Sequence, residues 1–283
     1  MKISPASTYK FNYIITVHNK ESLIRAVLMS VINCAGEHSC IYPVLDGCTD
    51  GSEQIIDDII QANPEFKIVK LYADDVHELK SINVALNYSD QQGAGFNIVL
   101  QDDVLLQDPN LEMKCIFLYQ SFPKLGLLSF RHGGNISRTA GNYSSVADIL
   151  EDYVQSEFGH YPKPKSMLTK DSFIFKEVIM KSPICIPFHI VREIGTPEEI
   201  YAPWDDVAYC YKVSRAGYAN GVFAINFRSD VSWGTTRHKQ QKYQVEKVQE
   251  RNLFTFRTQY PDLEPLDLKK YNNVIYTIAE VSA

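Results

Sequence analysis

Two pairs of adjacent carboxylates are the residues of this sequence best suited to chemistry. The first pair, Asp102 and Asp103, follows Gln101 and the apolar run Phe96–Leu100, where a buried strand would end. Mg²⁺ and Mn²⁺ prefer a few carboxylates together with phosphate oxygens. The pair therefore predicts a site where a divalent cation offsets the charge of a diphosphate, although the same acids would also fit a turn or a helix cap.

The second pair, Asp205 and Asp206, follows Trp204 and opens a predicted helix over Asp205–Ala216. Acids in a first helical turn accept hydrogen bonds from free N–H groups and interact with the helix dipole, which is worth about 1 kcal/mol. A carboxylate within hydrogen-bond reach of a hydroxyl can instead act as a general base. Both interpretations stay open from the residues alone.

Strand and helix patterns alternate over the first hundred residues. Helical spacing of apolar side chains predicts helices at Glu21–Asn33, Ser52–Gln61 and His77–Tyr88. Short apolar runs around them predict strands at Phe11–Val17, Ile41–Leu45, Phe66–Tyr72 and Phe96–Leu100. This order predicts an α/β fold, with a mostly parallel, Rossmann-like sheet flanked by helices.

Polar clusters follow three of these predicted strands. They are His18-Asn19, Asp46-Gly47 and Gln101-Asp102-Asp103. In parallel sheets, ligands bind beyond the carboxyl ends of the strands. Asp46 can accept a hydrogen bond from a base or a ribose, and the segment Thr16–Asn19 can form the other wall of a base pocket. We therefore expect one site at this edge of the sheet.

The second half of the chain is less regular. A helix at Leu111–Phe122 is followed by an expected long loop at Arg131–Tyr161, rich in Gly, Ser, Asn and Tyr. Further predicted elements are strands at Gly126–Phe130, Phe173–Phe175, Ile184–Phe188 and Val222–Phe227, and a long polar helix at Lys239–Tyr260. We expect one compact domain, because no repeat or linker interrupts the chain.

Composition narrows the class of protein. The 283 residues carry a net charge of −6, which argues against a general nucleic-acid binder because such proteins usually show a basic surface. The six cysteines are scattered without metal-ligand spacing, as in proteins of reducing compartments. No signal peptide and no apolar run of about 20 residues is visible in the sequence. We expect a cytoplasmic protein, compatible with peripheral docking on the inner face of a membrane.

Five motifs in series resemble the family 2 glycosyltransferases, which have the GT-A fold. In chain order they are Thr16–Glu21 (TVHNKE), Leu45–Ser52 (LDGCTDGS), Lys80–Leu86 (KSINVAL), Leu100–Asp103 (LQDD) and Trp204–Val207 (WDDV). The resemblance covers about Tyr13–Gly217. The stretch Val231–Tyr260 is less specifically similar to the C-terminal part of rhamnosyltransferase-like members.

The resemblance implies an activity and a division of the chain. The family transfers a sugar, with inversion, from a nucleotide-diphosphate sugar to a hydroxyl, usually with Mn²⁺ or Mg²⁺. The donor would carry UDP, dTDP or GDP, and the acceptor would be a glycan or lipid-linked glycan of polysaccharide biosynthesis. One GT-A domain would span 1–283, with a nucleotide-sugar half at about 9–104, an acceptor and catalytic half at about 105–238, and a C-terminal helical segment at 239–283.

The resemblance also implies roles for single residues. Asp206 would be the catalytic base, with Asp205 standing where the family usually has Glu. Asp103, together with Asp102, would bind the metal and phosphate, and His238 is a candidate extra ligand. The residues expected to bind the nucleotide or the sugar are Thr16, His18, Asn19, Glu21, Asp46, Lys80, Asn83, Asp102 and Trp204. For Trp204, the residues alone favour ordinary packing over contact with a sugar.

Departures from the family pattern keep a second function in view. Leu45 and Gln101 stand where the family commonly has Asp, and Ala208 where a further acid is frequent. A degenerate protein that binds a nucleotide sugar or a glycan without turnover is therefore the alternative. A nucleotidyltransferase and a dinucleotide-dependent oxidoreductase are disfavoured, because residues 16–21 contain no glycine for a phosphate-binding loop.

Overall fold

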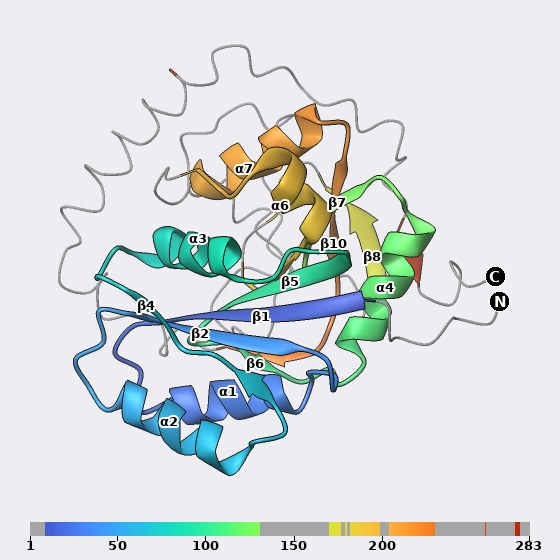
Figure 1. Ribbon diagram of the computed structural model, residues 1–283. Helices are drawn as coiled ribbons and strands as arrows, with labels where there is room; N and C mark the ends of the chain where they lie inside the picture. Colours follow the sequence, from blue (N-terminus) through green and yellow to red (C-terminus); the bar gives the residue numbers. More distant parts are fainter. Residues whose placement is uncertain are drawn as a thin grey trace. The chain divides into compact units, whose positions relative to one another are not determined.

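The computed structural model describes residues 9–130, 170–176, 179, 182–198, 204–229, 258 and 275–277, and for 204–207 and 275–277 it describes the backbone alone (Figure 1). The chain divides into two compact units. Residues 9–123, 182–196 and 225–228 belong to the first unit, and the other described residues to the second. The predicted loop Arg131–Tyr161, the predicted helix Lys239–Tyr260 and His238 lie outside the described residues.

The first unit is built on a mixed, largely parallel sheet, which confirms the predicted α/β fold. Its strands run in the order β9 (Ile184–Pro187), β5 (Ala94–Gln101), β1 (Tyr9–Val17) and β2 (Cys40–Asp46), with β3 (Lys67–Ile68) and β4 (Leu71–Ala73) both paired to β2. All these pairs are parallel except β5 with β9. The prediction of one strand at Phe66–Tyr72 is wrong, because β3 and β4 are separate short strands.

Helices cover both faces of this sheet. Helix α3 (Glu78–Tyr88) packs on β1 and β2 from one side, while α1 (Ile24–Ile32) and the adjoining α2 (Ser52–Ala62) lie on the other (Figure 1). Residues 11–17 of β1 are all buried, as expected for a central strand covered on both faces. Helix α1 begins three residues later than predicted, because Lys20–Leu23 form a turn in which the Leu23 and Ile24 N–H groups bond the Lys20 carbonyl.

Shorter elements complete the first unit. Helix α4 (Leu111–Ser121) matches its prediction, and the sequence analysis did not predict α6 (Phe188–Ile194), which packs on β5. Strands β6 (Leu105–Leu106) and β11 (Phe227–Arg228) form a small antiparallel pair. Two segments from late in the chain, 182–196 and 225–228, therefore complete a unit that begins at the N-terminal half.

The second unit contains further strands that pair with one another. Strand β10 (Ala219–Phe223) pairs in parallel with β7 (Leu125–Ser129) and antiparallel with β8 (Ser172–Phe175), and β8 pairs antiparallel with β12 (Ile275–Thr277). Helix α7 (Trp204–Arg215) packs on β7 and β10. Among the helices of the described residues, none combines the length and apolar character needed to cross a membrane.

Candidate functional site

The carboxyl ends of the parallel strands bring three predicted polar clusters together. The register places Val17 beside Leu45, Thr16 beside Gln101, and Asp46 beside Ala73. As a result, the backbone N–H of His18 donates to Asp102 Oδ2 at 2.9 Å, and His18 Nδ1 lies 2.6 Å from the carbonyl oxygen of Asp46. The loops that follow β1, β2 and β5 are therefore joined by direct hydrogen bonds.

Asp102 is the buried member of the first acid pair. It is 5% exposed, and its Oδ1 lies 3.2 Å from Nζ of Lys20, which is itself 7% exposed. Burial raises the pKa of Asp102 to about 6, although the Lys20 ammonium and the His18 N–H lower it. Its oxygens hold the loop after β1 in place, whereas Asp103 is partly exposed. Asp103 is thus the better placed of the two to meet a ligand.

Asp46 fixes a fourth loop, the one between β4 and α3. It is 2% exposed, and its two carboxylate oxygens accept hydrogen bonds from the backbone N–H groups of Val76 at 2.7 Å and His77 at 3.1 Å. Asp75 and His77 have φ values of 52° and 80°, in the left-handed region that such residues rarely adopt. The buried carboxylate therefore stabilises a strained loop.

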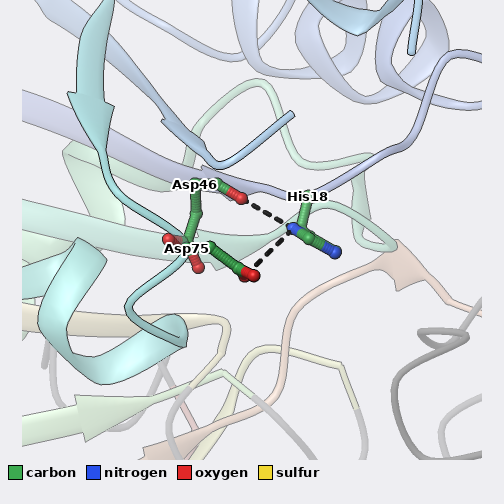
Figure 2. A group of neighbouring side chains, drawn as sticks. All are labelled: His18, Asp46 and Asp75. Atoms are coloured by element: carbon green, nitrogen blue, oxygen red, sulfur yellow. Dashed lines mark hydrogen bonds and ion pairs between the residues drawn. The ribbon is translucent and has the colours of Figure 1, made fainter. Parts of the chain in front are cut away.

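His18, Asp46 and Asp75 form a cluster at this edge (Figure 2). Their candidate ligand atoms lie within 4.8 Å of one another, and His18 Nδ1 is 3.8 Å from Asp75 Oδ1. A carbonyl oxygen can only accept, so Nδ1 carries the proton that it donates to Asp46. Nδ1 is then not available to a metal ion, and the unprotonated Nε2 is the ring nitrogen that could bind one. The cluster could therefore hydrogen-bond to an organic ligand or offer its carboxylates and imidazole to a cation.

Further hydrogen bonds fasten the loop after β1 to the loop after β2. Asn19 Oδ1 accepts from the Thr49 N–H at 2.7 Å, and Glu21 Oε2 accepts from the Gly51 N–H at 2.9 Å. The Lys20 N–H donates to Ser52 Oγ at 2.8 Å. Asn19 and Glu21, both predicted to bind the nucleotide, thus direct these oxygens to the neighbouring loop and shape the edge of the site.

The remaining predicted residues are spread over both units. Thr16 is buried at the end of β1, and Lys80 and Asn83 are half-buried on α3, three residues apart. Trp204, Asp205 and Asp206 form the first turn of α7 in the second unit, where only the backbone is described. His238 lies outside the described residues. That Asp206 and Asp103 share one cleft therefore stays a prediction.

Two residues of this edge were missed by the sequence analysis, Lys20 and Asp75. Asp46 is the last residue of β2 and Asp75 comes two residues after the end of β4, so a polar residue near the end of this strand was the available signal. Lys20 carried no such signal. A lysine beside a strand end is normally exposed, and its burial depends on Asp102 from a distant part of the chain.

The comparisons with known proteins bear on the fold. PcManGT, a mannosyltransferase from Pyrobaculum calidifontis in complex with GDP-Man and Mn²⁺, matches with a TM-score of 0.59 and 13% identity, over 94% of this chain and 68% of its own. S. aureus TarS 1–349 in complex with UDP matches with a TM-score of 0.52 and 18% identity, over 86% of this chain and 65% of its own. The same protein in complex with UDP-GlcNAc matches with a TM-score of 0.54 and 16% identity, over 84% of this chain and 64% of its own.

These matches confirm the predicted GT-A glycosyltransferase fold. The chain spans just under two thirds of the two TarS 1–349 chains. No protein-family model and no curated protein matches the sequence. The activity, the metal and the acceptor are therefore inferred from the residues of this chain.

Proposed function

We propose that the protein is an inverting family 2 glycosyltransferase. It would move a sugar from a nucleotide-diphosphate sugar to a hydroxyl of a glycan or lipid-linked glycan, in the cytoplasm or at the inner face of a membrane. The observation that carries this proposal is the joining of four strand-end loops around His18, Asp46 and Asp102, at the edge where parallel sheets bind ligands. The GT-A fold supports it, because similar structures hold GDP-Man, UDP or UDP-GlcNAc.

In this proposal the residues of the first unit bind the donor. The loops after β1, β2 and β4 face the nucleoside, and Asp103 faces the diphosphate. Asp103 would hold Mn²⁺ or Mg²⁺, which supplies positive charge to stabilise the leaving diphosphate. The Lys20–Asp102 pair keeps Asp102 inward, so that the acid at the strand end nearest the ligand is Asp103.

In the same proposal Asp206 activates the acceptor. Asp206, in the first turn of α7, would take the proton of the acceptor hydroxyl while the oxygen attacks the anomeric carbon opposite the leaving diphosphate. A single displacement of this kind inverts the anomeric configuration. Asp205 would assist in the place where the family has Glu.

The test is release of a nucleoside diphosphate from a panel of UDP-, dTDP- and GDP-sugars with Mn²⁺, using the full chain. We expect turnover with at least one donor and a loss of about 10²- to 10⁴-fold in Asp206→Asn, with nucleotide affinity unchanged. Asp58→Asn, an exposed acid on α2, is the matched control and should keep full activity. Normal turnover by Asp206→Asn would overturn the base assignment.

A second measurement addresses the metal. Asp103→Ala should lose the part of nucleotide affinity that depends on Mn²⁺, as measured by calorimetry with and without the ion. Unchanged binding would refute the role of Asp103.

One observation favours a non-catalytic nucleotide-sugar-binding protein as the second candidate. Gln101 replaces a family carboxylate and Asp102 is engaged with Lys20, which leaves fewer acids at this strand end for a cation. Slow hydrolysis of any donor, seen as free nucleoside diphosphate, would exclude this candidate. Tight donor binding without any release would establish it.

A further inference from the structure

Asp75 is held at the candidate nucleoside site by a loop whose backbone is fixed from several directions. The Asp46 carboxylate accepts hydrogen bonds from the N–H groups of Val76 and His77, the two residues after Asp75. The Gly47 N–H donates to the Ala73 carbonyl at 2.9 Å. The loop is therefore tied to the end of β2 on both sides of Asp75. A loop held in this way does not need to be ordered by the ligand it meets.

The packing against Gly47 fixes Asp75 further. A Cβ atom at Gly47 would lie 2.6 Å from the Cβ of Asp75, so only glycine leaves room for this approach. Gly47 also has a φ of +61°, which glycine adopts without strain. By contrast, the Asp75 carboxylate is 65% exposed and lies beside the His18 ring (Figure 2). A fixed backbone thus presents an exposed carboxylate next to a flat ring.

We propose that Asp75 reads the base of the donor nucleotide and that this base is guanine, an inference that rests on the proposed function. The Watson–Crick edge of guanine presents two adjacent donors, N1–H and the N2 amino group. Two carboxylate oxygens accept both in parallel, which is the strong bidentate form of a charge-assisted hydrogen bond.

The other bases match this carboxylate less well. Uracil and thymine offer a single N–H between two carbonyl oxygens, so one carboxylate oxygen would face a carbonyl. Adenine and cytosine each offer one amino group beside a ring nitrogen that accepts. Asp46, at the end of β2, is 2% exposed, whereas the Asp75 side chain is 65% exposed, so Asp75 is the more accessible reader.

The experiment measures Kd by calorimetry for GDP, UDP, dTDP and xanthosine diphosphate, with Mn²⁺ and the full chain. Xanthine replaces the N2 amino group of guanine by a carbonyl oxygen. The intact chain should bind GDP about tenfold or more tightly than the other three. Asp75→Asn offers one donor and one acceptor, so it should lose about tenfold for GDP and gain affinity for xanthosine diphosphate.

Asp74→Asn is the matched control, because it removes the same charge from the neighbouring exposed residue and should keep the GDP preference. An equal loss for all four nucleotides in Asp75→Asn would show a merely structural residue and overturn the inference. Tighter binding of UDP or dTDP than of GDP would overturn it while leaving the proposed function intact. Failure of every nucleotide to bind would overturn both.

Discussion

At the carboxyl ends of β1, β2 and β5, charged side chains make contacts between segments, whereas the amino ends of β1 and β5 combine aromatic rings with a buried amide pair, Asn12 and Asn97. Tyr9 stacks on Phe96 with ring centroids 5.7 Å apart, and Phe96 contacts Tyr119 at 4.8 Å. These rings line a pocket of about 500 Å³. Lys10 and Asp90 form an ion pair nearby, both about half exposed.

The difference shows that features which fix geometry at a cost in stability lie at the carboxyl end of the sheet. The carboxyl end has a buried ion pair, a buried carboxylate that holds a loop, and residues with positive φ. Such features cost free energy and persist where a site needs a fixed geometry. The amino end is held by ring packing, an exposed ion pair and a buried neutral hydrogen bond from Asn12 Nδ2 to Asn97 Oδ1 at 3.0 Å, and none of these buries a charge.

The largest expected effect comes from breaking the buried ion pair. Lys20→Met leaves the Asp102 charge buried without its cationic partner, which should cost about 3–5 kcal/mol in the free energy of unfolding, measured by urea denaturation. Lys10→Met removes the exposed counterpart and should cost less than about 1 kcal/mol. Equal losses would contradict the proposed difference between the two ends.

The pH dependence of stability should have opposite signs at the two ends. The pKa of Asp102 is about 6 in the folded protein, above its ordinary value of 3.8, so the folded state holds the proton more tightly than the unfolded chain. Its contribution to stability is full below pH 4 and falls, by about 3 kcal/mol, as the pH rises through 6.

Lys10 instead lowers the pKa of Asp90. The contribution of Asp90 to stability is therefore present above pH 4 and is lost as the pH falls. The measurement is the free energy of unfolding from pH 4 to 7 in metal-free buffer. Asp102→Asn cannot ionise, so the stability of the intact chain relative to this variant should decrease over this range. A constant difference would show that the pKa of Asp102 is not raised.

The smallest expected effect is the difference in stability between alanine variants of two glycines with positive φ. Gly47→Ala and Gly93→Ala both place a side chain in the left-handed region, at a cost of about 1–2 kcal/mol each. Only Gly47 has a neighbour in the way, Asp75, whereas nothing lies within 4 Å of a Cβ at Gly93. Gly47→Ala should therefore lose more stability and also weaken nucleotide binding, and equal effects would argue against the close approach of Asp75.

Most elements of the first unit could be predicted, because their apolar residues repeat at the strand or the helical period. The break in Phe66–Tyr72 could not, since Lys70 makes ion pairs at 2.7 Å with both Glu53 and Asp57 of α2 and the two flanking segments become separate strands. The antiparallel pairing of β9 with β5 was also beyond local pattern, because it joins residues about 90 positions apart.

The proximity of the strand-end clusters could be predicted from the sequence, but their side-chain directions could not. Strand ends identified His18, Asp46 and Asp102 as neighbours, and the hydrogen bonds between their segments agree with this. That Asp102 turns inward depends on the burial of Lys20, and that Asp46 holds a loop depends on backbone N–H groups of residues 76 and 77. Neither side-chain direction can be read from the spacing of apolar residues that predicts strands and helices.

The late arrival of β9 has a consequence for biosynthesis. Until residues 184–187 leave the ribosome, β5 has no partner on one side, and its apolar run presents unpaired backbone groups along an open edge. A truncated chain ending at residue 123 would keep that edge permanently and should aggregate. The nascent polypeptide therefore depends on its own downstream sequence, or on a chaperone in the interval, to stay soluble.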